Sequence, residues 1–239
     1  MLEKDLQSLL EQSGVCWFLD SGSLLGMIRE GAFLKHDHDI DIGILSEGKE
    51  DQIDKFIAVM ISKGFRAVKF FWGKVLYKCK LIPESSQIFP YIIDMQFYHA
   101  SGSDFICPQL VFRDQLTAFQ RIKLRWIRLR KSGAEGIESR KKSFKDSFKR
   151  VLRKIVTRKT IEIQYKKYSK MFDFYMWYIP KDYTDKFTNI NGYQVFKDNE
   201  NYLAYRYGDW KTPAKKWDFT KDDTGLKMTS YNYICDLYE

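Results

Sequence analysis

Hydrophobic and polar residues follow one another along this chain with two different periods, one typical of helices and one typical of strands. Apolar residues recur at helical spacing in 2–12 and 50–63, which predicts two amphipathic helices. Alternating or uninterrupted apolar residues predict strands at 15–19, 37–44, 65–71, 74–82 and 90–98. Helices and strands mixed in this order predict an α+β fold class, a mixed α/β unit.

A turn separates the first predicted strand from a short helix. Asp20-Ser21-Gly22-Ser23 is a cluster of turn and capping residues, and an apolar run follows it and ends at Gly31. Ser before such a run and Gly after it are start and stop signals of helices. We therefore expect a short helix over this run.

The remainder of the chain has weaker patterns. One apolar stripe repeats at helical intervals among Lys and Arg, and it consists of Phe144, Phe148, Val151, Leu152, Ile155 and Val156. Residues 161–178 are also predicted to be helical. The C-terminal residues are rich in Tyr, Trp, Asp and Lys, and their pattern predicts no definite element.

Composition excludes several classes of protein. Hydrophobic residues make up 44% of the 239 positions and aromatic residues 16%, which is enough for a large core and argues against disorder. The four cysteines form no CxxC or His-linked spacing, so a structural zinc site is not expected. Charges interrupt the first predicted helix, so it does not look like a secretory signal. The sequence contains no run of 18 apolar residues, so no membrane-spanning helix is predicted.

The net charge of +9 is unevenly distributed. Residues 121–170 contain 19 Lys and Arg against 4 Asp and Glu, a net charge of +15, whereas the remainder of the chain carries −6. Such a segment can attract an anionic membrane surface, a polyanionic acceptor or nucleic acid. The apolar stripe within it fits a helix lying at a membrane interface, or an ordinary amphipathic helix packed on a core with a solvated charged face.

Three aspartates occupy alternate positions in the strand predicted at 37–44. Alternate side chains of a strand share one face, so Asp37, Asp39 and Asp41 lie together, roughly 6.5–7 Å apart from one to the next. Like charges at this spacing repel, and Asp is a poor strand former. The pattern therefore indicates a hard cation such as Mg²⁺, which prefers oxygen ligands. A charged edge strand that blocks aggregation is the alternative.

Two more features fit a site for a metal ion and a phosphate group. Gly22-Ser23 opens the short helix, where backbone N–H groups can hold a phosphate and Gly permits its close approach; the alternative is an ordinary turn. Asp94 is a lone carboxylate in an otherwise apolar strand and needs a partner. It either completes the metal site from a neighbouring strand or forms a salt bridge with a Lys or Arg.

The order of these motifs resembles the nucleotidyltransferase superfamily typified by DNA polymerase β, with Gly-Ser, an Asp-x-Asp strand and a third Asp on a later strand. Residues 17–44 (WFLDSGSLLGMIREGAFLKHDHDIDIGI) resemble, more narrowly, the signature of the LicD/fukutin family. Residues 207–213 (YGDWKTP), followed by Trp217-Asp218, resemble its fukutin-like branch. The resemblance implies a DNA polymerase β-like nucleotidyltransferase fold, with a mixed sheet and added helices.

The family implies phosphotransfer from a CDP-activated donor. LicD-like members transfer phosphocholine to bacterial surface glycans, and fukutin-like members transfer ribitol phosphate to a glycan. In both, a hydroxyl of the acceptor attacks the β-phosphorus and CMP leaves. The resemblance thus implies an enzyme dependent on Mg²⁺ or Mn²⁺ that moves ribitol phosphate, glycerol phosphate or phosphocholine to a cell-surface glycan.

The resemblance also implies roles for individual residues. It assigns the metal ion to Asp37, Asp39, Asp41 and Asp94, with Asp39 or Asp94 placed to accept the proton of the acceptor hydroxyl. Substrate-binding roles fall on Gly22, Ser23, Arg29, Lys35, Arg206 and Asp209. The aromatic residues Tyr207, Trp210 and Trp217 either shape a pocket for the donor or acceptor, or simply pack.

The expected organisation has three parts: a nucleotidyltransferase catalytic core at 1–115, a basic helical segment at 116–180, and an aromatic-rich substrate-binding region at 181–239 packed on the core. The expected partners are a CDP-linked donor, a glycan or lipid-linked glycan acceptor and an anionic membrane surface. Scattered cysteines fit a reducing cytosol, so a cytoplasmic location is expected. The basic segment and a lipid-linked acceptor add the expectation of a peripheral position on the inner face of the membrane. A nucleotidyltransferase acting on RNA, protein or a small molecule is the alternative enzyme, although no RNA-binding signature appears. A non-catalytic scaffold is the alternative class.

Overall fold

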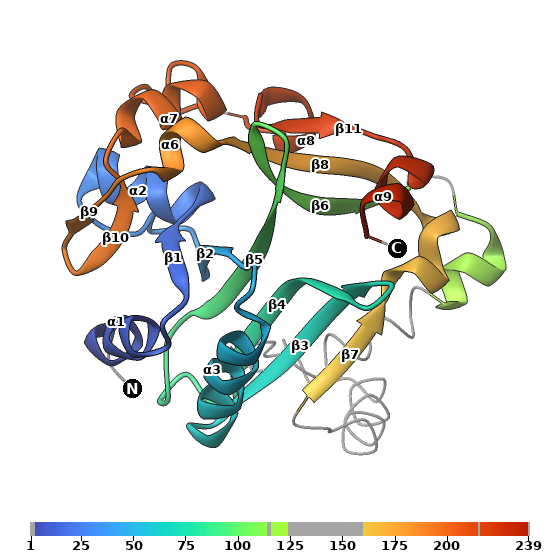
Figure 1. Cartoon of the computed structure of the whole chain (residues 1–239), viewed down its shortest axis with the longest axis horizontal. Coiled ribbons are helices and arrows are strands. Elements are labelled where there is room, and N and C mark those ends of the chain that lie inside the picture. The colour runs from blue at the N-terminus through green and yellow to red at the C-terminus, as the bar shows by residue number, and fades with distance from the viewer. Residues whose placement is uncertain (1–2, 114–115, 124–159, 215, 239) are drawn as a thin grey trace.

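A large mixed sheet forms the centre of this protein (Figure 1). The computed structural model describes residues 3–113, 116–123, 160–214 and 216–238. The strands are β1 (Cys16–Leu19), β2 (Asp39–Leu45), β3 (Phe65–Trp72), β4 (Val75–Pro83), β5 (Ile92–Ser101), β6 (Asp104–Phe112), β7 (Thr160–Gln164), β8 (Phe172–Pro180), β9 (Phe187–Ile190), β10 (Tyr193–Phe196) and β11 (Leu226–Met228). The helices are α1 (Glu3–Gln12), α2 (Ser21–Glu30), α3 (Glu50–Ser62), the 3-10 helix η1 (Tyr165–Met171), α6 (Lys181–Thr184), α7 (Asn199–Tyr207), α8 (Phe219–Asp222) and α9 (Tyr231–Tyr238).

Strand β5 holds the sheet together because it has three partners. It runs parallel to β2 on one side and antiparallel to β4 on the other, and its last residues pair with β6. From β6 the sheet continues through β8 to β11, and from β4 it continues through β3 to β7. The β3–β7 pair is parallel as well, so the sheet is mixed. The α+β class with a mixed sheet, predicted from the sequence, is confirmed.

Every element predicted before residue 100 is present, with ends shifted by at most three residues. Local signals explain this agreement. The short helix, for example, begins after Asp20, whose side chain accepts a hydrogen bond from the backbone N–H of Ser21, and it ends at Gly31 in the left-handed conformation. The apolar period was sufficient to predict these elements because each of them buries its own apolar face in the core.

The helix predicted at 161–178 is wrong. These residues form β7, η1 and most of β8. Ile161 and Ile163 are buried on one side of β7, and Phe172, Phe174 and Met176 are buried on one side of β8. This period of two, in a stretch rich in β-branched and aromatic residues, is typical of strands.

The part of the predicted basic helical segment that begins at residue 160 is therefore sheet and 3-10 helix up to residue 180, and residues 118–123 are helical. The apolar stripe from Phe144 to Val156 lies outside the described residues, so the interfacial helix stays a prediction. Strand β6, at the end of the predicted catalytic core, was not anticipated.

The two faces of the sheet differ in chemistry. The register aligns Asp41 of β2 with Asp94 of β5 and Lys80 of β4, so these three side chains share one face. Intervening residues such as Ile40, Ile42 and Ile44 point to the other face and are fully buried. Each such side chain contributes roughly 1.5–3 kcal/mol by its burial.

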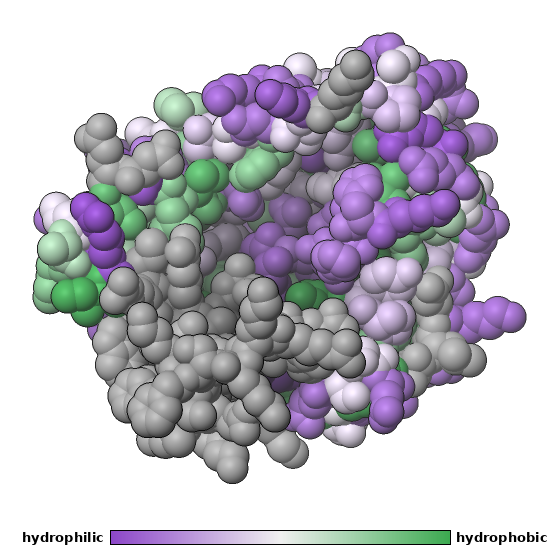
Figure 2. Space-filling view, turned by 180° about the vertical axis from the view of Figure 1, so that it is seen from behind, coloured by the Kyte–Doolittle hydropathy of each residue, from purple (hydrophilic) through white to green (hydrophobic). Residues whose placement is uncertain are grey.

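Helix α3 covers the apolar face. Lys69 of β3 points away from the face of Asp94 and pairs with Asp54 of α3, with 2.6 Å between Nζ and Oδ1. In Figure 1, α3 lies in front of β3 and β4, so the opposite face of the sheet, to which the register assigns Asp41 and Asp94, is turned away from the viewer. Figure 2 shows that side, which is hollowed near its middle, with hydrophilic residues gathered at the hollow.

The C-terminal region packs against the start of the chain. Strand β10 lies next to β1, and helix α7 lies next to α2. Phe18 of β1 stacks on Phe196 of β10, with ring centroids 4.4 Å apart. In the parts of the chain that the structure describes, no helix is both long and apolar enough to cross a membrane.

Candidate metal centre

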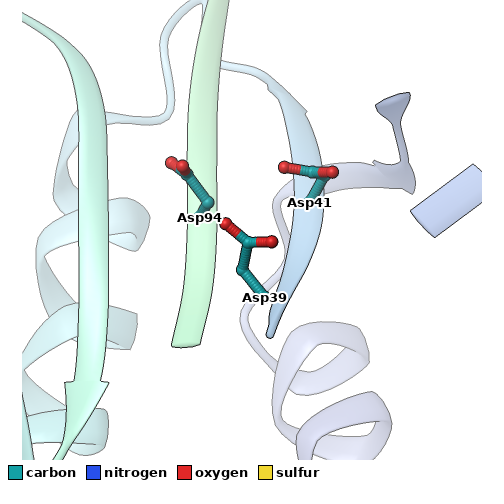
Figure 3. A group of neighbouring side chains, drawn as sticks. All are labelled: Asp39, Asp41 and Asp94. Atoms are coloured by element: carbon teal, nitrogen blue, oxygen red, sulfur yellow. The ribbon is translucent and has the colours of Figure 1, made fainter. Parts of the chain in front are cut away.

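Three carboxylates gather at β2 and β5, and Figure 3 shows them close together on these two neighbouring strands. Asp39 and Asp41 extend from β2, and Asp94 extends from β5 directly opposite Asp41. One carboxylate oxygen of each lies within 4.8 Å of the corresponding oxygens of the other two. Adjacent parallel strands make this possible because they place equivalent side chains about 4.8 Å apart on the same face.

The cluster is electrostatically strained. Burial raises the pKa of Asp41 well above its ordinary value, and the charges of Asp94 and Asp39 raise it further. Desolvation and like charge both disfavour the ionised carboxylate. A cation bound among the three groups would remove both penalties, because it would offset the charge that the carboxylates share.

Asp94 has one occupied and one unpaired oxygen. Its Oδ2 accepts from the ammonium groups of Lys80 at 2.7 Å and Lys78 at 3.0 Å. Burial by itself would raise the pKa of Asp94, but the two lysines outweigh it and hold the pKa at about 2. Its Oδ1 is buried and has no hydrogen-bond partner among the described residues. Both interpretations of Asp94 are thus compatible, since one oxygen forms salt bridges and the other is left for a cation.

The residues fit a hard divalent cation. All the candidate ligand atoms are carboxylate oxygens, which Mg²⁺ and Mn²⁺ prefer. A buried unpaired carboxylate oxygen such as Asp94 Oδ1 is costly unless a cation or a donor satisfies it. Asp39, Asp41 and Asp94 are therefore the residues that could hold the ion.

Asp37 is not one of the carboxylates that lie within 4.8 Å of one another. The strand begins at Asp39 rather than at Asp37, because Asp37 belongs to the preceding turn and donates its backbone N–H to the carbonyl of Leu34. Its carboxylate faces Gly22, and its Oδ1 is 3.8 Å from Nε2 of His36. The strand therefore begins two residues later than predicted, and the role of Asp37 as a metal ligand stays a prediction.

The first turn of α2 lies next to the carboxylates. A Cβ atom on Gly22 would be 2.8 Å from Oδ2 of Asp37 and 3.6 Å from Oδ2 of Asp41, so only Gly fits here without a shift. Ser23 is buried, and its hydroxyl oxygen accepts from the backbone N–H of Asp41 at 2.8 Å. Ser23 thus ties the helix N-terminus to the aspartate strand, and Gly22 leaves the space beside it open.

Arg206 lies behind this turn in a fully buried network. Its guanidinium donates to both carboxylate oxygens of Asp223 at 2.8–2.9 Å and to Oδ1 of Asp20 at 3.0 Å. It also donates to the hydroxyl of Tyr202 at 2.9 Å. The expected contact with a phosphate would have to displace these bonds, so the structure places Arg206 as a positioning residue for the turn that contains Ser21.

The other predicted substrate-binding residues differ in burial: the side chain of Arg29 is 15% exposed, and its Nε is buried with no hydrogen-bond partner among the described residues. Arg29 donates to the backbone carbonyl of Trp210 at 3.4 Å and pairs with Glu30 at 3.0 Å. Lys35 and Asp209 are exposed. Their roles in binding stay predictions.

Sequence reasoning missed Lys78 and Lys80. The signal was available, because the two lysines alternate with apolar residues in the strand predicted at 74–82, as Asp94 does in its own strand. Two charged residues on one face of a buried strand require partners, as a lone carboxylate does.

Comparison with known proteins agrees with the resemblance found in the sequence. Residues 14–121 match the family described as LicD/FKTN/FKRP, nucleotidyltransferase domain, and the matched segment contains all three clustered aspartates and both lysines. The family recognition is therefore confirmed for this segment. It supports a transferase, with phosphotransferase-type activity on glycans. No curated protein matches the chain.

Proposed function

We propose that this chain, whose residues 14–121 belong to the LicD/FKTN/FKRP family, transfers a phosphate-linked group from a CDP-activated donor to a hydroxyl of a cell-surface glycan and releases CMP. The group is a polyol phosphate, such as ribitol or glycerol phosphate, or phosphocholine. The observation that carries the proposal is the convergence of Asp39, Asp41 and Asp94, with an unpaired buried oxygen on Asp94. The nucleotidyltransferase fold is part of the same proposal.

Asp39, Asp41 and Asp94 would hold Mg²⁺ or Mn²⁺, which would neutralise charge on the diphosphate of the donor and on the leaving CMP. Catalysis of this kind depends on positioning and electrostatics more than on covalent chemistry. The N-terminus of α2 contributes to both, because its backbone N–H groups beside Gly22 favour a phosphate oxygen.

One of the carboxylates would also take the proton of the attacking hydroxyl. Asp94 is a poor base because its two lysine partners hold its pKa at about 2. Asp41 lies deeper in the cluster, between Asp94 and the N-terminus of α2. Asp39 is therefore the base that we assign, in agreement with one of the two roles expected from the resemblance.

The test is release of CMP from CDP-ribitol, CDP-glycerol and CDP-choline in the presence of Mg²⁺ and a glycan acceptor. Wild-type protein should turn over at least one donor, and Asp39→Asn should abolish turnover without loss of fold. Asp54→Asn is the matched control, since Asp54 pairs with Lys69 on the opposite face of the sheet and should leave turnover intact. No turnover of any donor, together with transfer from ATP or CTP to RNA, protein or a small molecule, would establish the alternative nucleotidyltransferase function.

A lipid-linked glycan is the acceptor that we favour, and with it a position at the inner face of a membrane. The support is the basic composition of residues 121–170, since each Lys or Arg near anionic lipid contributes about 1 kcal/mol. Co-sedimentation with vesicles of phosphatidylglycerol should exceed that with phosphatidylcholine and should fall at high salt. Equal sedimentation with both would contradict the membrane part of the proposal.

A further inference from the structure

Two lysines of β4 converge on one carboxylate oxygen beside the candidate metal centre. Lys80 lies directly opposite Asp94 in the register, and Lys78 lies opposite Gln96 on the same face. Their Nζ atoms are 2.7 and 3.0 Å from the same Oδ2 of Asp94, and their side chains are only 15% and 18% exposed. Both ammonium groups therefore lie within the site and not on the solvated surface.

The charge at this position exceeds what Asp94 needs. One carboxylate is neutralised by one ammonium group, yet Asp94 has two. With Asp39 and Asp41 included, the three clustered carboxylates and the two lysines sum to −1 when all are ionised, and a divalent cation would bring that sum to +1. The carboxylate of Asp37, at the first turn of α2, would bring the total to 0, so the loaded site would no longer repel an anion.

The same corner also has unused hydrogen-bonding capacity. An ammonium group has three donors, and among the described residues Asp94 is the one carboxylate within ion-pair distance of either lysine. Gln96 is 5% exposed, and its Oε1 has no partner in the described part of the chain. Lys78 and Lys80 therefore have N–H donors to spare on the face of the aspartates, whereas the unpaired Oε1 of Gln96 is an acceptor and adds nothing to the binding of an anion.

We infer that Lys78 and Lys80 form the phosphate-binding side of this site and hold a diphosphate whose other oxygens meet the cation at the aspartates. Lysine binds phosphate as a point charge, and the remaining N–H groups of each ammonium suit non-bridging oxygens. Oδ2 of Asp94 keeps both lysines in place, and its Oδ1 is left for the cation. The inference rests on the proposed function for the identity of the donor, but its chemical content is the binding of a diphosphate.

A narrower role is the alternative that the test must separate. The lysines could serve only to neutralise and orient Asp94. In that case their loss would weaken the binding of the cation and of the diphosphate together, because both would depend on the position of Asp94. If the lysines contact the phosphate directly, their loss should weaken diphosphate binding but not cation binding. The affinity for the cation should stay equal or rise, because removal of a positive charge beside carboxylates strengthens cation binding.

The experiment uses the full chain and inorganic pyrophosphate as the probe. Calorimetry gives its affinity in the presence of Mg²⁺, and electron paramagnetic resonance gives the affinity for Mn²⁺ alone. Lys78→Gln and Lys80→Gln should each bind pyrophosphate at least tenfold more weakly, while Mn²⁺ affinity stays equal or rises. Lys80→Arg should recover part of the loss. Lys69→Gln is the control, because Lys69 is equally buried at 15% exposure but lies on the opposite face.

Two results would overturn the inference: unchanged pyrophosphate affinity in both Gln variants, or a parallel loss of pyrophosphate and Mn²⁺ affinity. Thermal unfolding of each variant checks that it is folded, and Lys80→Arg retains the charge if a Gln variant is not. The CMP-release assay separates this inference from the proposed function. If CMP release depends on Asp39 but pyrophosphate binding is unchanged in the lysine variants, the inference about the lysines is wrong and the proposed function stands. If pyrophosphate binding depends on the lysines but no CDP donor releases CMP, the proposed function is wrong and the inference about the lysines stands.

Discussion

Replacement of Arg206 by Met should destabilise the protein severely. Arg206 is 1% exposed, and the carboxylates of Asp20 and Asp223 that it neutralises are 0% and 4% exposed. The substitution preserves most of the side-chain volume but removes the charge and every donor of the guanidinium. Two buried carboxylates would then lose their only cationic partner among the described residues.

Asp20 and Asp223 should contribute unequally to the loss of stability. Asp223 loses all three bonds from Arg206 and keeps the one from the backbone N–H of Gly225. Asp20 loses one bond and keeps those from Ser21 N and from the hydroxyl groups of two tyrosines, Tyr98 and Tyr202. Removal of one partner from a buried ion pair costs about 3–5 kcal/mol, and most of that loss should arise at Asp223. A domain of ordinary stability, at about 5–15 kcal/mol, would keep about 0–12 kcal/mol after this loss and would be only marginally folded at the lower end of that range.

The assay is urea unfolding of wild type, Arg206→Met, Asp223→Asn and the double variant. We expect the double variant to be more stable than the sum of the single losses predicts, by about 0.5–3 kcal/mol, because Asp223→Asn removes the charge that Arg206→Met leaves unpaired. Arg113→Met is the control: Arg113 pairs with Asp173 at 3.0 Å, but both side chains are 47% exposed, so the loss should be below about 1 kcal/mol. If Arg206→Met costs no more than this control, the network does not support the α2 turn as argued. Should Arg206→Met fail to fold, Arg206→Lys is measured in its place. It keeps the charge but not the planar fork, so its free energy of unfolding should lie between those of wild type and Arg206→Met.

Three further predictions follow from local geometry. Gly22→Ala should lower CMP release, because its Cβ would lie 2.8 Å from Oδ2 of Asp37 and 3.6 Å from Oδ2 of Asp41 and would fill space that a phosphate needs. Unfolding by urea should show equal or higher stability, since Ala is a better helix former than Gly; unchanged release would mean that the turn does not border the site. Gly43→Ala should destabilise the fold by about 1–3 kcal/mol, as its Cβ would lie 2.2 Å from the ring of Phe18, and a loss under 0.5 kcal/mol in urea, roughly the level of a surface change, would contradict the packing. Burial lowers the pKa of His99 below its ordinary value of 6.5, so protonation favours the unfolded chain and the free energy of unfolding should fall as pH drops below about 6.5. His99→Gln should reduce that fall between pH 7.5 and 5.5, and identical pH profiles would exclude His99 as its source.

Much of the site could be predicted because its first elements are local. Asp39 and Asp41 share a face because the period of a strand is two, whatever the strand packs against. Gly22 and Ser23 were placed correctly at a helix start, because capping signals act within a few residues. The family resemblance added the expectation that Asp94 belongs with them, and the structure brings it to 4.8 Å or less from both.

Other features depended on contacts between distant parts of the chain. Arg206 was expected at a phosphate, but it lies in a network with Asp20, which is 186 positions earlier. The segment 161–178 was expected to be helical, but pairing of β7 with β3 and of β8 with β6 makes it sheet. In both cases the local sequence allows more than one state, and burial against a distant partner selects one of them.

The sequence by itself determined that two aspartates share a face, that a glycine-containing turn precedes them, and that the chain builds an α+β fold. The tertiary structure decided which strands are neighbours and in what register. That decision places Asp94 between Asp41 and Lys80, moves Asp37 out of the strand, and leaves Oδ1 of Asp94 unpaired among the described residues while two lysines share its Oδ2. The physical reason is that side-chain period is a local property of the backbone, whereas strand order and register follow from the packing of the whole core.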